Sequence, residues 1–259
     1  MVICLNYCKG EFVIENEADT SMFLKLLSIL SSLSNYAKIE KKSDSLSIYT
    51  IDKLELSVAI LRLHTNSKED LLLEKIFKIS VIPKFIKYVN PKSIKISDNG
   101  IRIFALHKQT NKETIIDLEW LDVEYPSVNA SSLDELISSS FTIKIDKESL
   151  TKIFDIYMLS DVDELRFIYK NGSIYLQGVG LGVSISHFSE DKQVGSLNNV
   201  SEIVFRIPSM YIRMLYLTLR LLENVSVYIK DNSPLVISGN TLLSIPSTLY
   251  LLIASRSEK

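Results

Sequence analysis

One pattern occurs twice in the chain: residues 12–49 read FVIENEADTSMFLKLLSILSSL…SLSIY, and residues 142–175 read TIKIDKESLTKIFDIYMLSD…NGSIY. In both copies a strand-like run leads into an amphipathic helix, and a Ser-Ile-Tyr strand follows. Lys25 and Lys152 take the same place in the two helices, 127 residues apart. A chain of 259 residues that repeats at about half its length indicates two similar, fused domains.

Each half also repeats internally. Ile82-Pro83 and Ile207-Pro208 occupy corresponding places, and each introduces a helix, because proline at the first helical position has no hydrogen bond to lose. Short β-branched or aromatic runs, separated by polar turns, precede and follow the expected helices. The pattern predicts an α+β fold in which each domain is a doubled strand–helix–strands unit. The expected helices span residues 18–34, 83–90, 147–160 and 208–223.

The repeat also predicts the domain limits. We expect an N-terminal domain over residues 1–120, of which residues 1–10 are an extension, and a C-terminal domain over 138–259. Residues 121–137, LDVEYPSVNASSLDELI, are acidic and lack clear periodicity. This composition is typical of an exposed connector between domains.

Composition describes an ordinary globular protein. Hydrophobic residues make up 46% of the chain and the formal net charge is −2, so no overall basic field indicates a nucleic-acid partner. Cys4 and Cys8 lack nearby histidines, and we expect reduced thiols. No signal peptide and no apolar run of about 18 residues occurs. These features predict an intracellular, cytoplasmic protein without membrane contact, nucleoid-associated if the source is prokaryotic.

Enzyme signatures are weak. His64, His107 and His187 have no partner at metal-ligand spacing. The glycines of residues 178–182, GVGLG, precede a strand-like run rather than the helix that a phosphate-binding loop needs. We therefore expect no catalytic residue, no metal and no cofactor. An α+β enzyme with a site built from scattered carboxylates stays open as an alternative, and it predicts turnover or tight metal binding.

The expected helices carry basic stripes. Ser21, Lys25, Ser28 and Ser32 share one helix face, and the last helix repeats this spacing with Ser209, Arg213, Tyr216 and Arg220. The opposite face of the last helix, with Met210, Met214, Leu217 and Leu221, is expected to pack on a sheet. If four equivalent helices share one side of a curved sheet, their cations form one surface suited to DNA phosphates without base readout. The candidate DNA-binding residues are Lys25, Lys84, Lys87, Lys147, Lys152, Arg213 and Arg220, against the acids Glu148 and Asp155.

With these units in place, the chain resembles a sliding clamp of the proliferating-cell-nuclear-antigen (PCNA) type over about residues 11–256. Besides the repeats, the resemblance is carried by Ile51-Asp52, Leu121-Asp122-Val123-Glu124, Ser233-Pro234-Leu235 and the ending from Tyr250 to Arg256. It implies three two-domain subunits in a ring, as a homo- or hetero-trimer, with helices lining the hole and sheets outside. It also implies that strands near 113–118 and 182–188 of neighbouring subunits pair.

The resemblance further implies a function. Such a ring encircles double-stranded DNA without sequence specificity and tethers a DNA polymerase, and a clamp loader and a flap nuclease or ligase bind it through short peptide motifs. The implied peptide-binding residues lie beside the connector and at the C-terminal end: Ile51, Leu56, Val58, Tyr125, Pro126, Pro234, Leu252 and Ala254.

This chain also departs from the family's pattern. The last strand ends in Ala254-Ser255-Arg256, where the family usually has Ala-Pro followed by Lys or Arg. These departures indicate a divergent subunit, of the kind that forms hetero-oligomeric clamps in some archaea. A checkpoint-type clamp subunit with other clients stays open as a second alternative.

Overall fold

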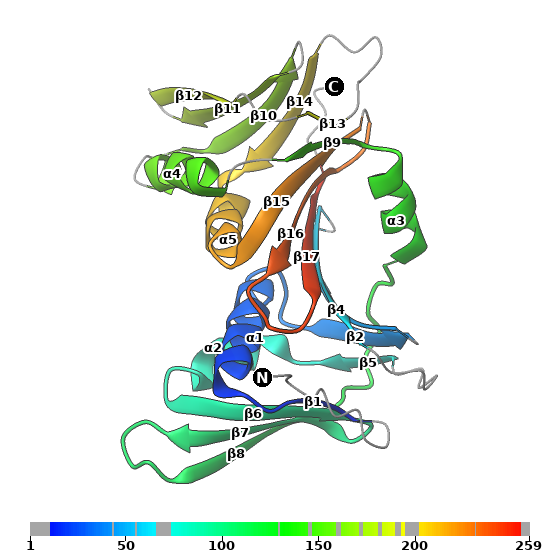
Figure 1. Cartoon of the computed structure of the whole chain (residues 1–259), viewed down its shortest axis with the longest axis vertical. Helices are drawn as coiled ribbons and strands as arrows, with labels where there is room; N and C mark the ends of the chain where they lie inside the picture. The colour runs from blue at the N-terminus through cyan, green and yellow to red at the C-terminus, as the bar shows by residue number, and fades with distance from the viewer. Residues whose placement is uncertain are drawn as a thin grey trace. The chain divides into compact units, whose positions relative to one another are not determined.

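A computed structural model describes residues 11–42, 44–54, 56–65, 74–128, 130–144, 147–158, 162–170, 173–180, 183–189, 193–194, 202–230 and 232–254. The chain forms two compact units (Figure 1). Unit 1 comprises Met1–Ser127 and Thr241–Thr248, and unit 2 comprises Val128–Asn240 and Leu249–Lys259. The expected extension at 1–10, with its two cysteines, lies outside the described residues. The domain limits expected from the sequence stay predictions.

The elements follow one another as the fourfold repeat predicts: each repeat is a strand, a helix and three strands. Unit 1 holds β1 (Phe12–Ile14), α1 (Glu17–Leu30), β2 (Ala37–Lys42), β3 (Ser45–Ile51) and β4 (Ser57–His64), then β5 (Glu74–Phe77), the 3-10 turn η1 (Ile79–Val81), α2 (Ile82–Phe85), β6 (Val89–Ser97), β7 (Gly100–His107) and β8 (Glu113–Leu118). Unit 2 begins with α3 (Ala130–Ser138), β9 (Phe141–Lys144), α4 (Lys147–Met158), β10 (Glu164–Lys170), β11 (Ser173–Gly180), β12 (Val183–Ser189) and β13 (Gln193–Val194). The last repeat is β14 (Glu202–Pro208), α5 (Ser209–Leu219), β15 (Leu222–Ile229), β16 (Leu235–Thr241) and β17 (Ser247–Ile253).

The two repeats of each unit exchange their first strands. In unit 1, β1 pairs antiparallel with β6, and β5 pairs antiparallel with β2. In unit 2, β9 pairs with β15 and β14 pairs with β10, again antiparallel. The resulting strand orders are β1-β6-β7-β8 and β4-β3-β2-β5 in unit 1, and β12-β11-β10-β14 and β13-β9-β15-β16-β17 in unit 2. Because of this exchange, neither repeat of a unit can complete its sheet alone.

The start of α1 is held by a polar cluster in unit 1. Asn16 caps the helix, and its Oδ1 accepts the Asp19 N–H at 2.7 Å. Asp19 is buried and accepts the Ser244 N–H at 2.8 Å and the Ser244 hydroxyl. Burial alone would raise the pKa of Asp19, but the hydrogen bonds from Ser244 and Asn16 outweigh it and lower this pKa. The turn between β16 and β17 is thereby attached to the N-terminus of α1.

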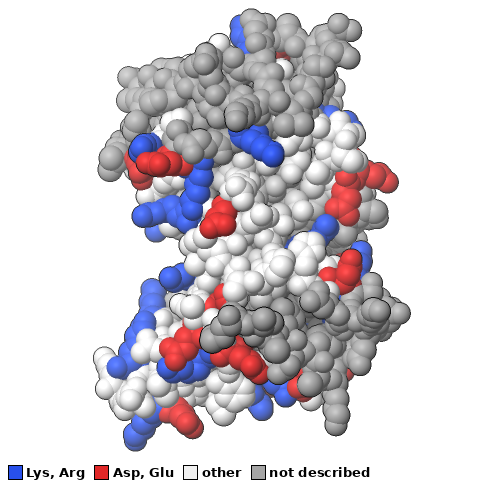
Figure 2. Space-filling view, viewed as in Figure 1, with Lys and Arg blue, Asp and Glu red and all other residues white. Residues whose placement is uncertain are grey.

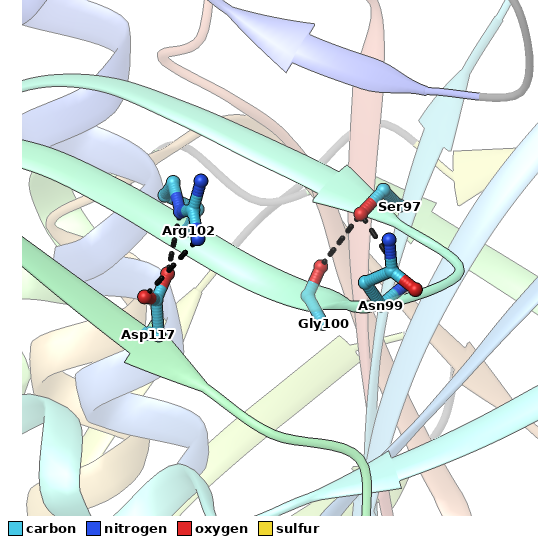
Figure 3. Close-up of polar contacts among 5 residues, drawn as sticks. All are labelled: Ser97, Asn99, Gly100, Arg102 and Asp117. Atoms are coloured by element: carbon cyan, nitrogen blue, oxygen red, sulfur yellow. Dashed lines mark hydrogen bonds and ion pairs between the residues drawn. The ribbon is translucent and has the colours of Figure 1, made fainter.

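Figure 3 shows an ion pair between β7 and β8, Arg102 with Asp117, near the β6–β7 turn. The Arg102 Nε donates to Asp117 on the neighbouring strand at 2.7 Å, and this pair raises the pKa of Arg102. In the β6–β7 turn, the Asn99 N–H donates to the Ser97 hydroxyl at 3.4 Å. Gly100 has a φ of 141°, and a Cβ there would lie 2.6 Å from the Leu118 carbonyl oxygen. A hollow of about 300 Å³ lies between this turn and β8.

Helix α5 buries only part of the face that was expected to pack on a sheet, including Met214. Met210 is 64% exposed and Leu217 is 39% exposed, although both were expected to pack on a sheet. The buried residues of α5 are Tyr211, Ile212, Met214, Leu215, Thr218 and Leu219. Apolar residues surround most of this helix, so their periodicity alone does not choose a buried side.

Two further elements differ from the expectation. The connector, which lacks clear periodicity in sequence, contains helix α3 over Ala130–Ser138, and Leu133 of this helix is buried. Leu133, Leu136 and Ile137 do follow helical spacing, but the run is too short to stand out. Helix α2 ends at Phe85 rather than at 90, because β6 already begins at Val89 and takes in Pro91 across a bulge.

Candidate nucleic-acid interface

In unit 1, α1 and α2 pack against each other and present exposed lysines (Figure 1). Lys25 lies on α1, Lys84 lies on α2, and Lys87 directly follows α2. The Leu24, Leu26 and Leu27 side chains on either side of Lys25 are buried, so the register of α1 leaves this ammonium in solvent. Among the residues that the structure describes, no carboxylate forms an ion pair with these three lysines.

Lys108 adds a fourth cation to this region, which the sequence did not indicate. Its Nζ donates to the Ile86 and Lys87 carbonyl oxygens, each at 3.0 Å. A cation at this place satisfies carbonyl groups that the end of α2 leaves without helical partners. Lys108 lies in the turn between β7 and β8, so only the tertiary fold brings it beside Lys87.

In unit 2 the basic residues of α4 and α5 are closely accompanied by acids. The Lys152 Nζ lies 2.9 Å from the Glu148 carboxylate, one turn earlier on α4. Arg220 donates to the Tyr216 hydroxyl at 3.1 Å, and its guanidinium lies 5.5 Å from the centre of that ring. A hydrogen bond between Tyr216 and Asp155 of α4 raises the pKa of Tyr216. The structure thus joins Asp155, Tyr216 and Arg220 across the two helices.

The two remaining candidates of unit 2 lie at the starts and exposed sides of their helices. Lys147 is the first residue of α4 and is half-buried. Arg213 is exposed on α5, and no carboxylate of the described residues pairs with it. Figure 2 shows Lys and Arg atoms over the helices of each unit, with acidic atoms among them. All seven candidate cations therefore lie on or directly beside helices.

The expected peptide-binding residues divide between the units. Unit 1 holds Ile51 at the end of β3, Leu56 and Val58 around the start of β4, and Tyr125 and Pro126 in the connector. Ile51 is buried, Leu56, Val58 and Tyr125 are half-buried, and Pro126 is exposed. Unit 2 holds the half-buried residues Pro234, Leu252 and Ala254, at the start of β16 and at the end of β17.

Tyr125 is the best anchored residue of this set. Its hydroxyl accepts the Ile51 N–H at 2.9 Å and donates to the Tyr36 carbonyl at 3.1 Å. The Tyr125 ring lies 6.2 Å from that of Tyr49, tilted by 49°. Burial raises the pKa of Tyr125, so this phenol stays protonated and can hold both bonds. The structure therefore joins Ile51 and Tyr125, which sequence resemblance had placed in one site.

Tyr49 also belongs to a charged cluster that the sequence did not reveal. Lys38 is buried and forms ion pairs with Glu40, at 3.2 Å, and with Glu74. The Tyr49 hydroxyl donates to Glu40 at 2.8 Å, and burial together with this carboxylate raises the pKa of Tyr49 to about 12. Burial alone would lower the pKa of Lys38, but the hydrogen bonds of Lys38 with Glu74, Tyr49 and Glu40 outweigh burial and raise this pKa. The cluster links β2, β3 and β5.

Two of the histidines that the sequence singled out, and part of the glycine run, lie at strand ends. His64 and His107 end β4 and β7, and the run from Gly178 leads into β12, as the strand pattern predicts. Gly182 and the side chain of His187 lie outside what the structure describes. Over the described ranges, no three His, Cys, Asp or Glu side chains gather in a way that could hold a metal ion. In the same ranges, no helix has both the length and the apolar character to cross a membrane.

Comparison with known proteins shows the fold. No protein-family model and no curated protein matches the chain in sequence. The solved structure of PCNA from Entamoeba histolytica matches with a TM-score of 0.71 at 13% identity, covering 96% of this chain and 100% of that one. A PCNA2–PCNA3 complex from Sulfolobus tokodaii also gives 0.71, at 16% identity with 96% and 100% coverage. PCNA from Thermococcus kodakaraensis gives 0.65 at 14% identity, with 95% and 99% coverage. The chain has the fold of the PCNA sliding clamps along almost its whole length.

Proposed function

We propose that the protein is a subunit of a DNA sliding clamp, which encircles duplex DNA and tethers a polymerase and other replication or repair proteins. The observation that carries this proposal is the fold: four strand–helix–strands repeats that match PCNA structures over at least 95% of the chain. The exposed cations on the helices support it, because loose phosphate contacts without base readout suit a protein that slides.

We propose that the ring forms through the sheet edges. β8 is an edge of one sheet of unit 1, and β12 is an edge of one sheet of unit 2. Ile115 on β8 is 57% exposed, and an exposed apolar edge strand is open to pairing with another chain. Head-to-tail pairing of β8 with β12 of a neighbour repeats until the ring closes. The neighbour is a second copy of this chain or a sister subunit.

We propose that clients bind by an apolar peptide at the residues that the resemblance implies, which include Ile51 and Tyr125 of unit 1, aided by backbone pairing. A polymerase, a clamp loader, a flap nuclease and a ligase are the expected classes of client. A checkpoint-type clamp differs only in its clients and shares this account of the ring. For the enzyme alternative, no cluster of His, Cys, Asp or Glu that could hold a metal ion occurs among the described residues.

The proposal is tested by replacing Lys84, Lys87 and Arg213 together by alanine. We expect the variant to fold, because all three side chains are exposed, and to lose most stimulation of a cognate polymerase on primed circular DNA. The matched control removes three exposed lysines from strands and turns of unit 1: Lys42, Lys53 and Lys75. Equal stimulation by the helix variant and the unaltered protein would contradict the proposed DNA surface.

A further inference from the structure

We propose that the DNA contact is concentrated on α1 and α2 of unit 1, and that Glu148 and Asp155 of unit 2 restrain the cations of α4 and α5. This inference rests on the proposed clamp function and assigns unequal roles to its two helix pairs. The two acids would then set how tightly the protein holds DNA.

The repeat supplies a matched pair of lysines with different neighbours. Lys25 of α1 corresponds to Lys152 of α4. Four residues before the lysine stands Ser21 in α1 and Glu148 in α4, and three residues after it stands Ser28 in α1 and Asp155 in α4. Side chains at these spacings are neighbours on a helix surface. The same helix face is therefore neutral around Lys25 and acidic around Lys152.

In α4 the first acid engages the lysine directly. The Lys152 Nζ and the Glu148 carboxylate lie 2.9 Å apart, and both side chains are largely exposed. Glutamate preceding lysine by four residues is the favourable order for such a pair. A phosphate that binds Lys152 must replace this carboxylate, or bind a lysine whose charge it already offsets. Lys152 should therefore contribute less to phosphate binding than Lys25 does.

The second acid acts on α5 through a tyrosine. Asp155 hydrogen-bonds with Tyr216, whose hydroxyl also accepts from Arg220 at 3.1 Å. The Arg220 guanidinium is held over the Tyr216 ring, 5.5 Å from its centre. A phosphate approaching Arg220 competes with this arrangement and meets the negative charge of Asp155. Arg213, one turn away from Tyr216 along α5, is the cation of this helix without such a neighbour among the described residues.

Two acids in the first turn of α1 in unit 1, Glu17 and Asp19, are engaged elsewhere. Glu17 forms an ion pair with Lys92 of β6. Asp19 is buried and occupied by Ser244 and Asn16. The lysines of α1 and α2 therefore remain available to phosphates, and Lys108 lies beside them at the end of α2.

A reciprocal exchange tests the inference. One variant carries Glu148→Ser with Asp155→Ser, and the other carries Ser21→Glu with Ser28→Asp. Each full-length protein is titrated onto a fluorescent short duplex DNA between about 50 and 200 mM salt, and the slope of log affinity against log salt is measured. We expect the slope to steepen by about one to two in the first variant and to become shallower by about one in the second, since each phosphate contact contributes about 0.9.

The controls separate the local effect from net charge and from misfolding. Asp44→Ser with Asp98→Ser removes two exposed acids from the β2–β3 and β6–β7 turns, outside the helices and the proposed ring edges, and should leave the slope within about 0.5. Lys25→Ala should reduce the slope more than Lys152→Ala, a comparison that adds no new charge to either helix. If the unaltered protein binds duplex DNA but neither exchange shifts the slope in its expected direction, and Lys25→Ala and Lys152→Ala reduce the slope equally, the inference is overturned. If the unaltered protein shows no salt-dependent binding, the proposed clamp function itself fails.

Discussion

Tyr125 illustrates how one side chain fixes a segment that has no regular structure. Its hydroxyl bonds to Ile51 and Tyr36 while its ring packs near Tyr49. We expect Tyr125→Phe to lower the free energy of unfolding in urea by about 1–3 kcal/mol, because the Ile51 N–H loses its partner. Tyr36→Phe is the matched control, since Tyr36 takes part through its backbone carbonyl, and should change stability by less than about 0.5 kcal/mol. Equal effects of the two substitutions would show that the hydroxyl of Tyr125 does not hold the connector.

Asp19 makes stability depend on pH in a defined direction. Its pKa in the folded protein is lowered from the ordinary value of 3.8, so its contribution is present above about pH 4 and is lost as the pH falls through the folded pKa. We expect Asp19→Asn to be less stable than the unaltered protein at neutral pH, and the difference to shrink as the solution is acidified below pH ~4. Urea unfolding across this range measures it. A difference that stays constant with pH would mean that the charge of Asp19 is not what stabilises the α1 cap.

At the scale of elements, helix α5 offers the clearest test of which helix face is buried. Leu215 is fully buried, whereas Leu217, two residues later, is 39% exposed. We expect Leu215→Ala to cost about 2–4 kcal/mol of unfolding free energy and Leu217→Ala less than about 1 kcal/mol. Thermal or urea denaturation of both variants measures the contrast. If Leu217→Ala destabilised the protein more than Leu215→Ala, the buried face would be the one that the sequence pattern predicted.

The elements also show what a sequence can predict. Strand and helix order was predictable because Ser-Ile-Tyr strands and Ile-Pro helix starts recur, and each repeat obeys its own local periodicity. The buried face of α5 was not predictable, since apolar residues cover most of the circumference of this helix. The strand exchange, the capping of α2 by Lys108 and the Lys38 cluster depend on residues far apart in sequence. Only packing of the whole unit brings such groups together.

The candidate site was predictable to the extent that it lies on the repeats. The stripe of Tyr216 and Arg220 follows helical spacing, and the two side chains do meet. That Asp155 reaches Tyr216 on another helix depends on how α4 packs against α5, which no spacing within one helix reveals. The expected peptide-binding residues came from resemblance and stay a prediction, and the structure adds the hydrogen bond between Ile51 and Tyr125.

At the scale of the whole molecule, the proposed clamp makes a topological claim. A ring should stay on DNA because the DNA has no end, while weak phosphate contacts let it slide. The chain, together with sister subunits if it needs them, is loaded on closed circular plasmid DNA by its loader, and bound protein is separated from free protein at moderate salt. We expect retention on the closed circle and release once a single restriction cut makes the DNA linear. Retention that is the same on circular and linear DNA, or absent from both, would contradict the account.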